Sequence, residues 1–576
     1  MAPRVPSYLS LILAKQLGTT LLFFLATLAG ACGRRPETGG VRPATATPAT
    51  DPAPFWNSAT VYFLLTDRFQ NGDSTNDRAL GRARDGAAAL RGFEGGDLAG
   101  VLQKIEEGYF DSLGVTAIWM TPFVEQIHAG VDEGTGKTYG FHGYWTRDWT
   151  AVDPALGTKD DLRAVVDAAH RHGIRVLMDA VINHTGPPTG QDPAWPEDWV
   201  RTAPNCSYKD YATTVDCTLV ATLPDIRTDR DTPVELPPVL LEKWAREGRR
   251  NQEVAELDAF FRRTGYPRGP RYYLIKWLTD WVRELGFDGY RVDTAKHFEP
   301  AVSAELKREA GLAFRDWKRS RVASRESVAG LDLPFYMVGE VYGWELSQGR
   351  DYSFGDRTVD FFSNGYDALI NFGFKSDTGS LNNLFTRYSA AIHQGALRGV
   401  SVLNYLSSHD DGSPYDVDRK DPLGAGTRLL LAPGGAQIYY GDELARPLKV
   451  RGAEGDANLR SFMNWADLRT RSTAEVLDHW RKLGRFRRAH PAVGAGVHRT
   501  LQARPYIFSR VLESRGRGDR VLVAMDQGEG AKTISVFGIF RDGTKLVDAY
   551  SGATGTVTNG AVSLPTGSDL VLLAAR

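Results

Sequence analysis

Three carboxylates of this chain follow three separate β-rich apolar runs. They are Asp293, Glu340 and Asp410, and a fourth run leads into Asn183 and His184. Cleavage of a glycosidic bond requires one carboxylate that attacks or stabilises an oxocarbenium-like centre and one protonated acid that assists the departing oxygen. A single Asp after a strand is more often a helix N-cap or half of a surface ion pair. Because four strand ends carry an acid or a histidine, the set as a whole favours a hydrolytic site.

Such residues can act together only if the fold gathers the ends of their strands. The sequence predicts buried strands at residues 60–65, 115–120, 174–179, 287–292, 335–339, 402–406 and 436–440. Between them apolar residues recur at helical spacing, as at Leu274, Trp277, Leu278, Trp281, Val282 and Leu285. Alternating strands and helices indicate parallel βα units. We therefore predict an α/β fold with a (β/α)8 TIM barrel, in which the C-terminal ends of the strands form the catalytic face.

Two segments interrupt this alternation and divide the chain into domains. Residues 186–270 are rich in Pro, Asp, Thr and Arg with weak periodicity, and we predict that they form an inserted domain B after the third strand. Over 496–576 the helical pattern stops and short apolar runs alternate with Gly-rich turns, which predicts a C-terminal antiparallel β-sandwich domain. The catalytic barrel then occupies 55–185 and 271–495.

The N-terminus has the layout of an export signal. Small residues follow an apolar run at 17–28, so residues 1–31 are typical of a secretory signal peptide and too short in their apolar part for a spanning helix. Cys32 comes next and resembles the lipidated first residue of a bacterial lipoprotein, although Ala29 stands where Leu is usual and an ordinary cleavage site also fits. Residues 32–54 hold Pro and Thr but no aromatic residue, as an extended tether would.

The cysteine count agrees with export. Cys206 and Cys217 lie eleven residues apart in a polar stretch, and in an oxidising compartment they can form a disulfide. Cys32 is then the odd cysteine, which suits lipidation. We predict a cell-envelope lipoprotein, periplasmic or on the outer surface, with free secretion as the alternative.

The composition excludes other classes of protein. The 576 residues hold 69 Lys+Arg and 70 Asp+Glu, whereas a chain that binds nucleic acid usually shows a basic excess. The 13 Trp, 22 Tyr and 26 Phe exclude a disordered chain. We predict a globular monomer with no nucleic-acid partner and no membrane contact beyond the N-terminal lipid.

The four strand-end segments resemble the signature regions of a known family. The signature regions of the α-amylase superfamily, whose members are (β/α)8 glycoside hydrolases, are similar to DAVINHTG (179–186), GYRVDTAKH (289–297), VGEVYG (338–343) and YLSSHDD (405–411). Its first barrel strand, substrate-side loop and short fifth region resemble VYFLLTDRFQNGD (61–73), FHGYWTRDW (141–149) and LPDI (223–226). The resemblance covers residues 55–576 and implies a retaining hydrolase that cleaves α-1,4-glucosidic bonds in starch or maltooligosaccharides.

The resemblance also implies roles for single residues. Asp293 is expected to be the nucleophile that forms a covalent glycosyl intermediate, Glu340 the acid/base, and Asp410 the residue that grips sugar hydroxyls. Opposite charge from Arg291 is expected to hold Asp293 ionised, and neighbouring negative charge to raise the pKa of Glu340. Retaining enzymes place such carboxyl groups about 5–5.5 Å apart. The positions implied to bind substrate are His142, Tyr144, His184, Arg291, Lys296, His297 and His409.

Two groups of oxygen-bearing residues are expected to bind calcium, the implied cofactor. An Asn/Asp/Gly cluster on its own is usually a turn, but the first group resembles an N-terminal calcium site of cyclodextrin-forming and related amylases. Its residues are Asn71, Asp73, Asn76, Asp77, Gly95 and Asp97. The second resembles the family's general calcium site, which links barrel and insertion, and consists of Asn183, Asp225 and the backbone of His297.

Departures from the family pattern define the alternatives. The 47 residues from Asp293 to Glu340 are more than is common, which predicts an extra element near the site. Ala221 stands where cyclodextrin-forming enzymes carry a bulky aromatic residue, which favours hydrolysis over cyclisation. A cyclomaltodextrinase- or neopullulanase-like hydrolase and an α-glucan transferase stay open. An inactive glycan-binding lipoprotein is disfavoured because all three carboxylates are present, and a metal hydrolase because no His pair has metal-ligand spacing.

Overall fold

The computed structural model describes residues 53–82, 86–323, 333–513 and 518–576. The predicted signal peptide, Cys32 and nearly all of the predicted tether lie outside these residues. Within the ranges described, no helix combines the length and the apolar character needed to cross a membrane.

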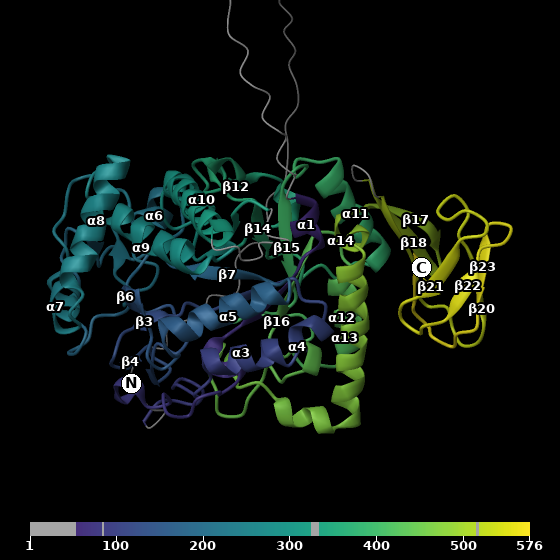
Figure 1. Cartoon of the computed structure of the whole chain (residues 1–576), viewed down its shortest axis with the longest axis horizontal. Helices are drawn as coiled ribbons and strands as arrows, with labels where there is room; N and C mark the ends of the chain where they lie inside the picture. The colour runs from purple at the N-terminus through teal and green to yellow at the C-terminus, as the bar shows by residue number, and fades with distance from the viewer. Residues whose placement is uncertain (1–52, 83–85, 324–332, 514–517) are drawn as a thin grey trace, which may run out of the picture. The chain divides into compact units, whose positions relative to one another are not determined.

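Eight parallel strands close into a barrel (Figure 1). They follow one another around the ring in chain order, and the last strand pairs with the first. Every residue of these strands is buried, as expected for parallel strands that are covered on both faces. The strands are β1 (Thr60–Leu64), β2 (Ala117–Met120), β7 (Arg175–Ala180), β10 (Gly289–Val292), β11 (Tyr336–Gly339), β14 (Ala368–Asn371), β15 (Ser401–Tyr405) and β16 (Gly435–Tyr439).

The predicted TIM barrel is confirmed, with one strand that the sequence did not reveal. Each of the seven predicted runs contains or overlaps a barrel strand. Strand β14 reads Ala-Leu-Ile-Asn, and its three apolar residues are too few to stand out from the loops around them.

Helices between the strands cover the outside of the barrel, and local sequence starts and stops them. Thr158 and Asp161 form a reciprocal capping box at the start of α5, and Gly286, with a φ of 84°, ends α9 in the left-handed conformation. The longer helices are α3 (Leu98–Glu106), α5 (Lys159–Arg171), α9 (Pro270–Leu285), α10 (Pro300–Ala323), α11 (Leu381–His393), α12 (Pro422–Leu430) and α13 (Arg471–Ala489). The short ones are α1 (Ala53–Ser58), α2 (Thr66–Phe69), α4 (Tyr109–Ser112) and α14 (Ala492–Ala495).

Helix α10 takes up most of the long spacing between Asp293 and Glu340. It has 24 residues and packs along α9. The described residues of this interval that line the cleft, apart from Asp293 and Glu340 themselves, are the strand-end residues Thr294, Lys296 and His297. In the described part of the interval no extra element lines the cleft, and much of that part is the outer helix α10.

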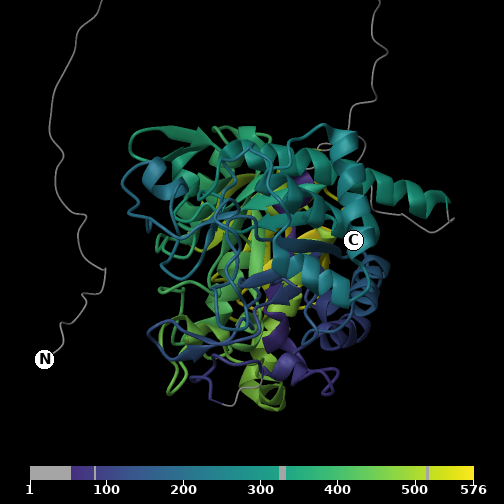
Figure 2. The same ribbon diagram turned by 90° about the vertical axis from the view of Figure 1, so that its left-hand side faces the viewer.

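Between β7 and α9 the chain forms the inserted region. It contains β8 (Val200–Arg201), α6 (Ala212–Val215), β9 (Asp225–Ile226), α7 (Pro238–Arg246) and α8 (Arg250–Thr264). In Figure 2 the side of the fold that carries α7 and α8 faces the viewer, and the C-terminal strands, in yellow, lie behind the barrel. Other small antiparallel pairs are β3 (Val124–Gln126) with β6 (Thr146–Val152), β4 (Val131–Asp132) with β5 (Lys137–Thr138), and β12 (Asp351–Ser353) with β13 (Thr358–Asp360).

The chain ends in an antiparallel β domain, shown in yellow in Figure 1. A six-stranded sheet and the β20–β23 pair share one apolar core, which makes the predicted sandwich. Arg510 of β18 is fully buried and donates hydrogen bonds to the carbonyls of Leu431, at 2.6 Å, and Val493 on the barrel side. The strands are β17 (Val497–Ala503), β18 (Tyr506–Leu512), β19 (Asp519–Ala524), β20 (Lys532–Ser535), β21 (Lys545–Asp548), β22 (Thr554–Thr556), β23 (Ala561–Leu564) and β24 (Val571–Ala575).

Candidate active site

A cleft of about 490 Å³ opens at the C-terminal ends of the barrel strands. Its walls come from the segments that follow β7, β10, β11, β15 and β16, from the loop before β6, from the β4–β5 hairpin and from the inserted region. All three predicted carboxylates lie in it. The lining residues are Glu133, His142, Tyr144, Trp145, His184, Tyr208, Leu219, Leu223, Asp293, Thr294, Lys296, His297, Glu340, Tyr342, Asp410, Asp456 and Arg460.

One buried guanidinium, that of Arg291 on β10, joins two of these carboxylates. Its Nη1 lies 2.7 Å from Asp293 Oδ1, and its Nη2 lies 2.7 Å from Glu340 Oε2. The backbone N–H of Thr294 also donates to Glu340 Oε2, at 2.9 Å. Because both carboxylates contact one rigid planar group, Arg291 holds them side by side at the floor of the cleft.

Asp179 completes this charged cluster, although sequence reasoning assigned it no role. Its carboxylate accepts hydrogen bonds from Arg291 Nη1 at 2.9 Å, Tyr144 OH at 2.7 Å and Trp119 Nε1 at 2.9 Å. The signal in the sequence was its place at the head of the DAVINHTG segment, one residue before β7 ends. Asp179 therefore orients both the guanidinium and the Tyr144 ring.

Burial and charge together set the pKa values of the paired carboxyl groups. Burial raises the pKa of Glu340 to about 7, and the negative charges of Asp293 and Asp410 add to this effect. Burial also raises the pKa of Asp293 to about 6, because it outweighs the attraction of Arg291. Arg291 lowers the pKa of Asp293 as expected, but it does not hold the group ionised at every pH. Between about pH 6 and 7 the two groups have the protonation states that a nucleophile and an acid need.

Asp410 differs from the other two carboxylates because it lies between a histidine and an arginine. Its side chain is 46% exposed to the cleft, with His409 Nε2 at 2.8 Å from Oδ2 and Arg460 in contact with Oδ1. Burial opposes ionisation of Asp410, but the charges of His409 and Arg460 outweigh it and hold the pKa of this carboxyl well below its ordinary value. Asp410 is therefore ionised and can accept hydrogen bonds from a ligand in the cleft. Sequence reasoning missed Arg460, which lies 50 residues further along the chain and in none of the quoted segments.

Two neutral histidines lie beside Tyr144. Burial lowers the pKa of His142 well below its ordinary value and that of His184 to about 4. His142 Nδ1 accepts from the backbone N–H of Tyr144 at 3.1 Å, and His184 Nε2 donates to its carbonyl at 3.1 Å. His184 Nδ1 is buried and has no hydrogen-bond partner in the described part of the chain, so it can accept a hydrogen bond from a ligand in the cleft.

Lys296 and two tyrosine rings form the cleft wall next to Glu340. Lys296 Nζ donates to the carbonyl of Tyr342 at 2.9 Å and to Tyr352 OH at 3.2 Å, and burial lowers the pKa of Lys296 to about 8. The side chains of Tyr342 and Tyr208 are 53% and 51% exposed. Exposed aromatic faces beside hydrogen-bonding groups suit the apolar face and hydroxyl edge of a sugar ring.

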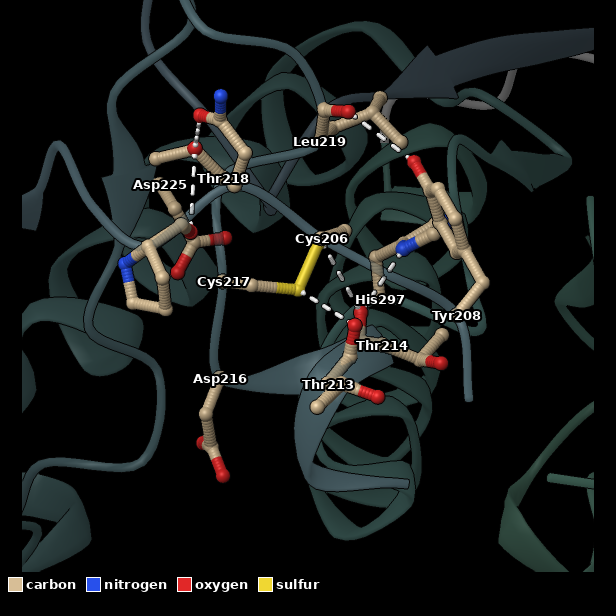
Figure 3. Close-up of a disulfide and its surroundings, with 12 residues drawn as sticks. Cys206, Tyr208, Thr213, Thr214, Asp216, Cys217, Thr218, Leu219, Asp225 and His297 are labelled. Carbon is tan, nitrogen blue, oxygen red and sulfur yellow. Dashed lines mark hydrogen bonds between the residues drawn. A yellow bond between two sulfur atoms is a disulfide. The ribbon is translucent and has the colours of Figure 1, made fainter. Parts of the chain in front are cut away.

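A disulfide between Cys206 and Cys217 closes the loop that carries Tyr208 (Figure 3). Tyr208 OH donates to the carbonyl of Leu219 at 3.0 Å, so the ring is fastened to the residues that follow the disulfide. Tyr208 and Leu219 both line the cleft. The disulfide thus restrains one wall of the candidate site.

Asp97 organises the first expected calcium site. It is buried at the N-cap of α3, and its carboxylate accepts from the backbone N–H groups of Asp73, at 2.7 Å, and Gly100, at 2.7 Å. Asn76 Nδ2 lies 3.3 Å from Asp97 Oδ2. The Oδ1 atom of Asn76 is buried without a hydrogen-bond partner in the segments described, and such an oxygen is one that a cation would satisfy.

The other residues of this group lie together nearby. Asn71 Nδ2 donates to Asp77 Oδ1 at 2.8 Å, and Gly95, with a φ of 92°, approaches both side chains so closely that a Cβ there would lie 2.7 Å from each. Among the described residues, no cluster of three or more His, Cys, Asp or Glu side chains has the arrangement of a metal site. Calcium ligands here would therefore include amide and backbone oxygens.

The second expected calcium site brings three oxygen-bearing groups together. The Asn183 side-chain amide faces His297 O and Asp225 Oδ1. If its nitrogen points toward them, it donates hydrogen bonds of 2.8 Å to His297 O and 3.2 Å to Asp225 Oδ1. If its oxygen points toward them, all three groups present oxygen atoms to the same point. Arg201 Nε lies 3.0 Å from Asp225 Oδ2. His297 Nδ1 donates to Thr214 O at 3.0 Å, and burial lowers the pKa of His297 to about 3, so its ring is neutral.

Comparisons with known proteins agree with these features. The family model for the alpha amylase catalytic domain matches residues 63–482. The chain is 37% identical over 507 residues to the periplasmic alpha-amylase of Escherichia coli (strain K12), and the alignment covers 78% of this chain and 70% of that protein. It is 26% identical over 500 residues to a cyclomaltodextrin glucanotransferase of Geobacillus stearothermophilus, with 84% of this chain and 61% of that protein covered.

Solved structures show the same fold at lower identity. An alpha-amylase from Geobacillus thermoleovorans, complexed with acarbose, superposes with a TM-score of 0.61 at 21% identity and covers 90% of this chain and 99% of its own. A gamma-CGTase from alkalophilic Bacillus clarkii superposes with a TM-score of 0.62 at 20% identity and covers 90% of this chain and 71% of its own.

Proposed function

This chain belongs to the α-amylase family, and from that premise we propose that it is a retaining glycoside hydrolase that cleaves α-1,4-glucosidic bonds in starch or maltooligosaccharides. The observation that carries the proposal is the pair of carboxyl groups, Asp293 and Glu340, that Arg291 holds together at the C-terminal face of the barrel. A pair bridged by one guanidinium suits a retaining mechanism, which needs the two groups close together.

In the first step, ionised Asp293 attacks the anomeric carbon and forms a glycosyl ester. Protonated Glu340 gives its proton to the glycosidic oxygen, and the leaving sugar departs with a free hydroxyl. In the second step Glu340, now a carboxylate, takes a proton from water, and the water oxygen attacks the anomeric carbon and releases Asp293. Two inversions at one carbon give net retention of the α configuration.

The other cleft residues bind and orient the sugar at the bond to be cleaved. Ionised Asp410 accepts hydrogen bonds from the hydroxyl groups of this sugar. Such bonds to a charged group are stronger than hydrogen bonds between neutral groups. Neutral His142 and His184 hydrogen-bond hydroxyls without adding charge. Tyr144, fixed by Asp179, presents its ring to the sugar.

Glucan transfer is the second candidate. The half-exposed rings of Tyr208 and Tyr342 offer an acceptor sugar a surface near Glu340, and one relative is a glucanotransferase. Leu219 and Leu223 line the cleft on either side of the exposed Ala221. The segment 219–223 contains no aromatic residue, so it offers no bulky ring around which a chain could curl. Water is therefore the favoured acceptor.

Calcium is part of the proposal, with the two groups described above as its ligands. The partnerless Asn76 Oδ1 and the oxygens around Asn183 fit a hard cation that prefers oxygen donors. The ion would stabilise the loop before α3 and the junction of barrel and insertion. Asp293, Glu340 and Asp410 are outside both groups.

Export is also proposed, on the basis of the signal-like N-terminus and of the periplasmic location in the name of the Escherichia coli relative. The disulfide in the cleft wall suits an oxidising compartment. Lipidation of Cys32 and a monomeric state complete the proposal. Mass spectrometry of the mature N-terminus and light scattering would test these two points.

The proposed roles can be separated with two variants and two substrates. Asp293→Asn should abolish turnover of both maltoheptaose and α-maltosyl fluoride. Glu340→Gln should lose at least about a thousandfold on maltoheptaose but still react with the fluoride, because fluoride departs without a proton. Early-time NMR of the anomeric protons should show α-configured products from the wild type. Initial β-anomers would refute retention, and a Glu340→Gln variant with half of the wild-type activity on maltoheptaose would refute the acid role.

A further inference from the structure

The acid/base indicates which end of the cleft receives which part of the substrate. Glu340 must reach the departing oxygen, so Tyr342 and Lys296 beside it lie on the leaving-group side. Arg460 contacts His409 O and the carboxylates of Asp410 and Asp456, none of which is a partner of Glu340 in the described ranges. Arg460 makes no hydrogen bond or ion pair to Glu340, Lys296 or Tyr342 in those ranges either, and we therefore assign it to the opposite, glycone side, where the sugars that stay on the enzyme would bind.

A row of alternating charges runs along this side from Asp410 to the β4–β5 hairpin. Arg460 Nη2 contacts Asp410 and lies 2.8 Å from Asp456 Oδ2. Arg91 Nη2 lies 2.8 Å from Asp456 Oδ1, and Arg91 Nη1 lies 3.6 Å from Glu133 Oε2. Asp456 and Glu133 both line the cleft. The row ends at Glu133, which is separated from Asp410 by Arg460, Asp456 and Arg91.

The hairpin that carries Glu133 is held firmly against the cleft. Val131 packs on the apolar cluster of Ile127, Trp145 and Leu223. In the turn, Asp132 Oδ1 accepts from two backbone N–H groups, those of Gly134 at 2.8 Å and Gly136 at 3.1 Å. Arg91 Nη1 donates to Thr138 Oγ1 at 3.3 Å, which fixes the second strand. These contacts hold the hairpin backbone at Glu133 without a ligand.

We propose that Glu133 is a specificity-determining residue that binds hydroxyls of a glucose unit remote from the cleaved bond, at the far end of the glycone side. The inference rests on the proposed function and names one further contact for its substrate. The Glu133 side chain is 33% exposed, and its 3.6 Å separation from Arg91 exceeds a hydrogen-bond length. Besides a contact with the Thr138 side chain, its carboxylate therefore has lone pairs for hydroxyl donors. A carboxylate at this point strengthens the binding of oligosaccharides that are long enough to reach it. It thereby fixes how the chain lies in the cleft and favours particular product lengths.

The test compares substrates that do and do not extend to the hairpin. The ratio of kcat/KM for maltoheptaose to kcat/KM for maltotriose is measured for the wild type, Glu133→Ala and Glu133→Gln. Asp132→Asn is the matched control, because it removes a negative charge from the same turn, keeps the Oδ1 acceptor and lies outside the cleft lining. We expect Glu133→Ala to lower the ratio about tenfold, as loss of a hydrogen bond to a charged group would, and Glu133→Gln to lower it less. Asp132→Asn should keep the wild-type ratio.

The product pattern gives a second readout. With maltoheptaose labelled at its reducing end, Glu133→Ala should spread cleavage over more bonds, because the chain has lost one contact that fixes its register. An active Glu133→Ala enzyme with an unchanged ratio and pattern would overturn the role of Glu133 and leave the proposed function intact. A ratio that falls equally in Asp132→Asn would also overturn it, because the effect would then be general to the turn. Wild-type protein that cleaves neither oligosaccharide would overturn the proposed function itself.

Discussion

Replacement of Asp179 by Asn should shift one limb of the pH–activity profile and leave the other in place. Asp179 Oδ1 and Asp293 Oδ1 lie 2.9 and 2.7 Å from the same atom, Arg291 Nη1, so the two carboxylate oxygens are at most about 6 Å apart. Two unit charges at that distance interact by about 3 kcal/mol at an effective dielectric constant near 20. This corresponds to about two pKa units, which the guanidinium between the carboxylates reduces. We expect the pKa of Asp293 to fall by one to two units in Asp179→Asn.

The sign follows from the charge that is removed. The negative charge of Asp179 raises the pKa of Asp293, so its loss lets Asp293 stay ionised to lower pH. The acid limb of kcat/KM, which lies near the Asp293 pKa of about 6, should move down. The alkaline limb should stay near 7, because the charges that raise the pKa of Glu340 are those of Asp293 and Asp410.

The assay is initial-rate hydrolysis of a soluble maltooligosaccharide from pH 4 to 9, normalised to each enzyme's own maximum. Asp153→Asn is the matched control, because Asp153 is also buried and paired with an arginine, Arg82, but lies outside the cleft lining. An Asp179→Asn profile with an unmoved acid limb would refute the electrostatic reasoning. So would a shift of both limbs by the same amount, because it would indicate a general change in the site.

Three further predictions concern stability. Excess EDTA should lower the melting temperature of the protein, with a smaller effect in Asn76→Ala, because calcium binding would stabilise only the folded state; an unmoved melting temperature would contradict the calcium proposal. Glu443 is fully buried beneath Tyr62 OH and Tyr109 OH, and burial raises its pKa to about 7 from 4.5, so its ionisation should destabilise the fold by about 3 kcal/mol as pH rises through that range. Urea unfolding at pH 4.5 and 7.5 should show a loss that is smaller in Glu443→Gln than in the wild type by this amount, and equal loss in both would exclude Glu443 as a source. The Cys206→Ser/Cys217→Ser double variant should unfold with about 3 kcal/mol less free energy, as expected for an eleven-residue loop, and reductant should destabilise the wild type similarly but leave the variant unaffected.

The barrel and the three carboxylates could be predicted because their signals are local in sequence. Strand-end motifs such as GYRVDTAKH place Arg291 in β10 and Asp293 just after its end, two residues apart, and in an extended chain that spacing puts both side chains on one face. Strand β14 could not be predicted, since four residues bounded by loops carry too little periodicity.

The long-range partners of the site escaped prediction for a different reason. Arg460 belongs to the segment after β16 and Glu133 to the β4–β5 hairpin, and the closed barrel brings these segments to the same cleft. The pKa of Asp293 was hard to foresee as well, because sequence shows its neighbour Arg291 but not how completely water is removed from both.

The contacts of Arg510 limit how the C-terminal β domain could be exchanged between members of this family. The β domain contributes a cation that donates to two main-chain carbonyls of the barrel side and to His498 Nδ1 of its own sheet. The boundary near residue 496 therefore separates two topologies but not two self-sufficient modules. A domain transplanted from a relative would have to supply an equivalent buried donor, because a packed interface without one would leave these two carbonyls buried without partners. Recombination at this boundary is thus constrained by polar contacts outside the cleft lining, which include those of Arg510 and the hydrogen bonds from Ala492 N–H to Asp519 and from Thr500 to Asn382.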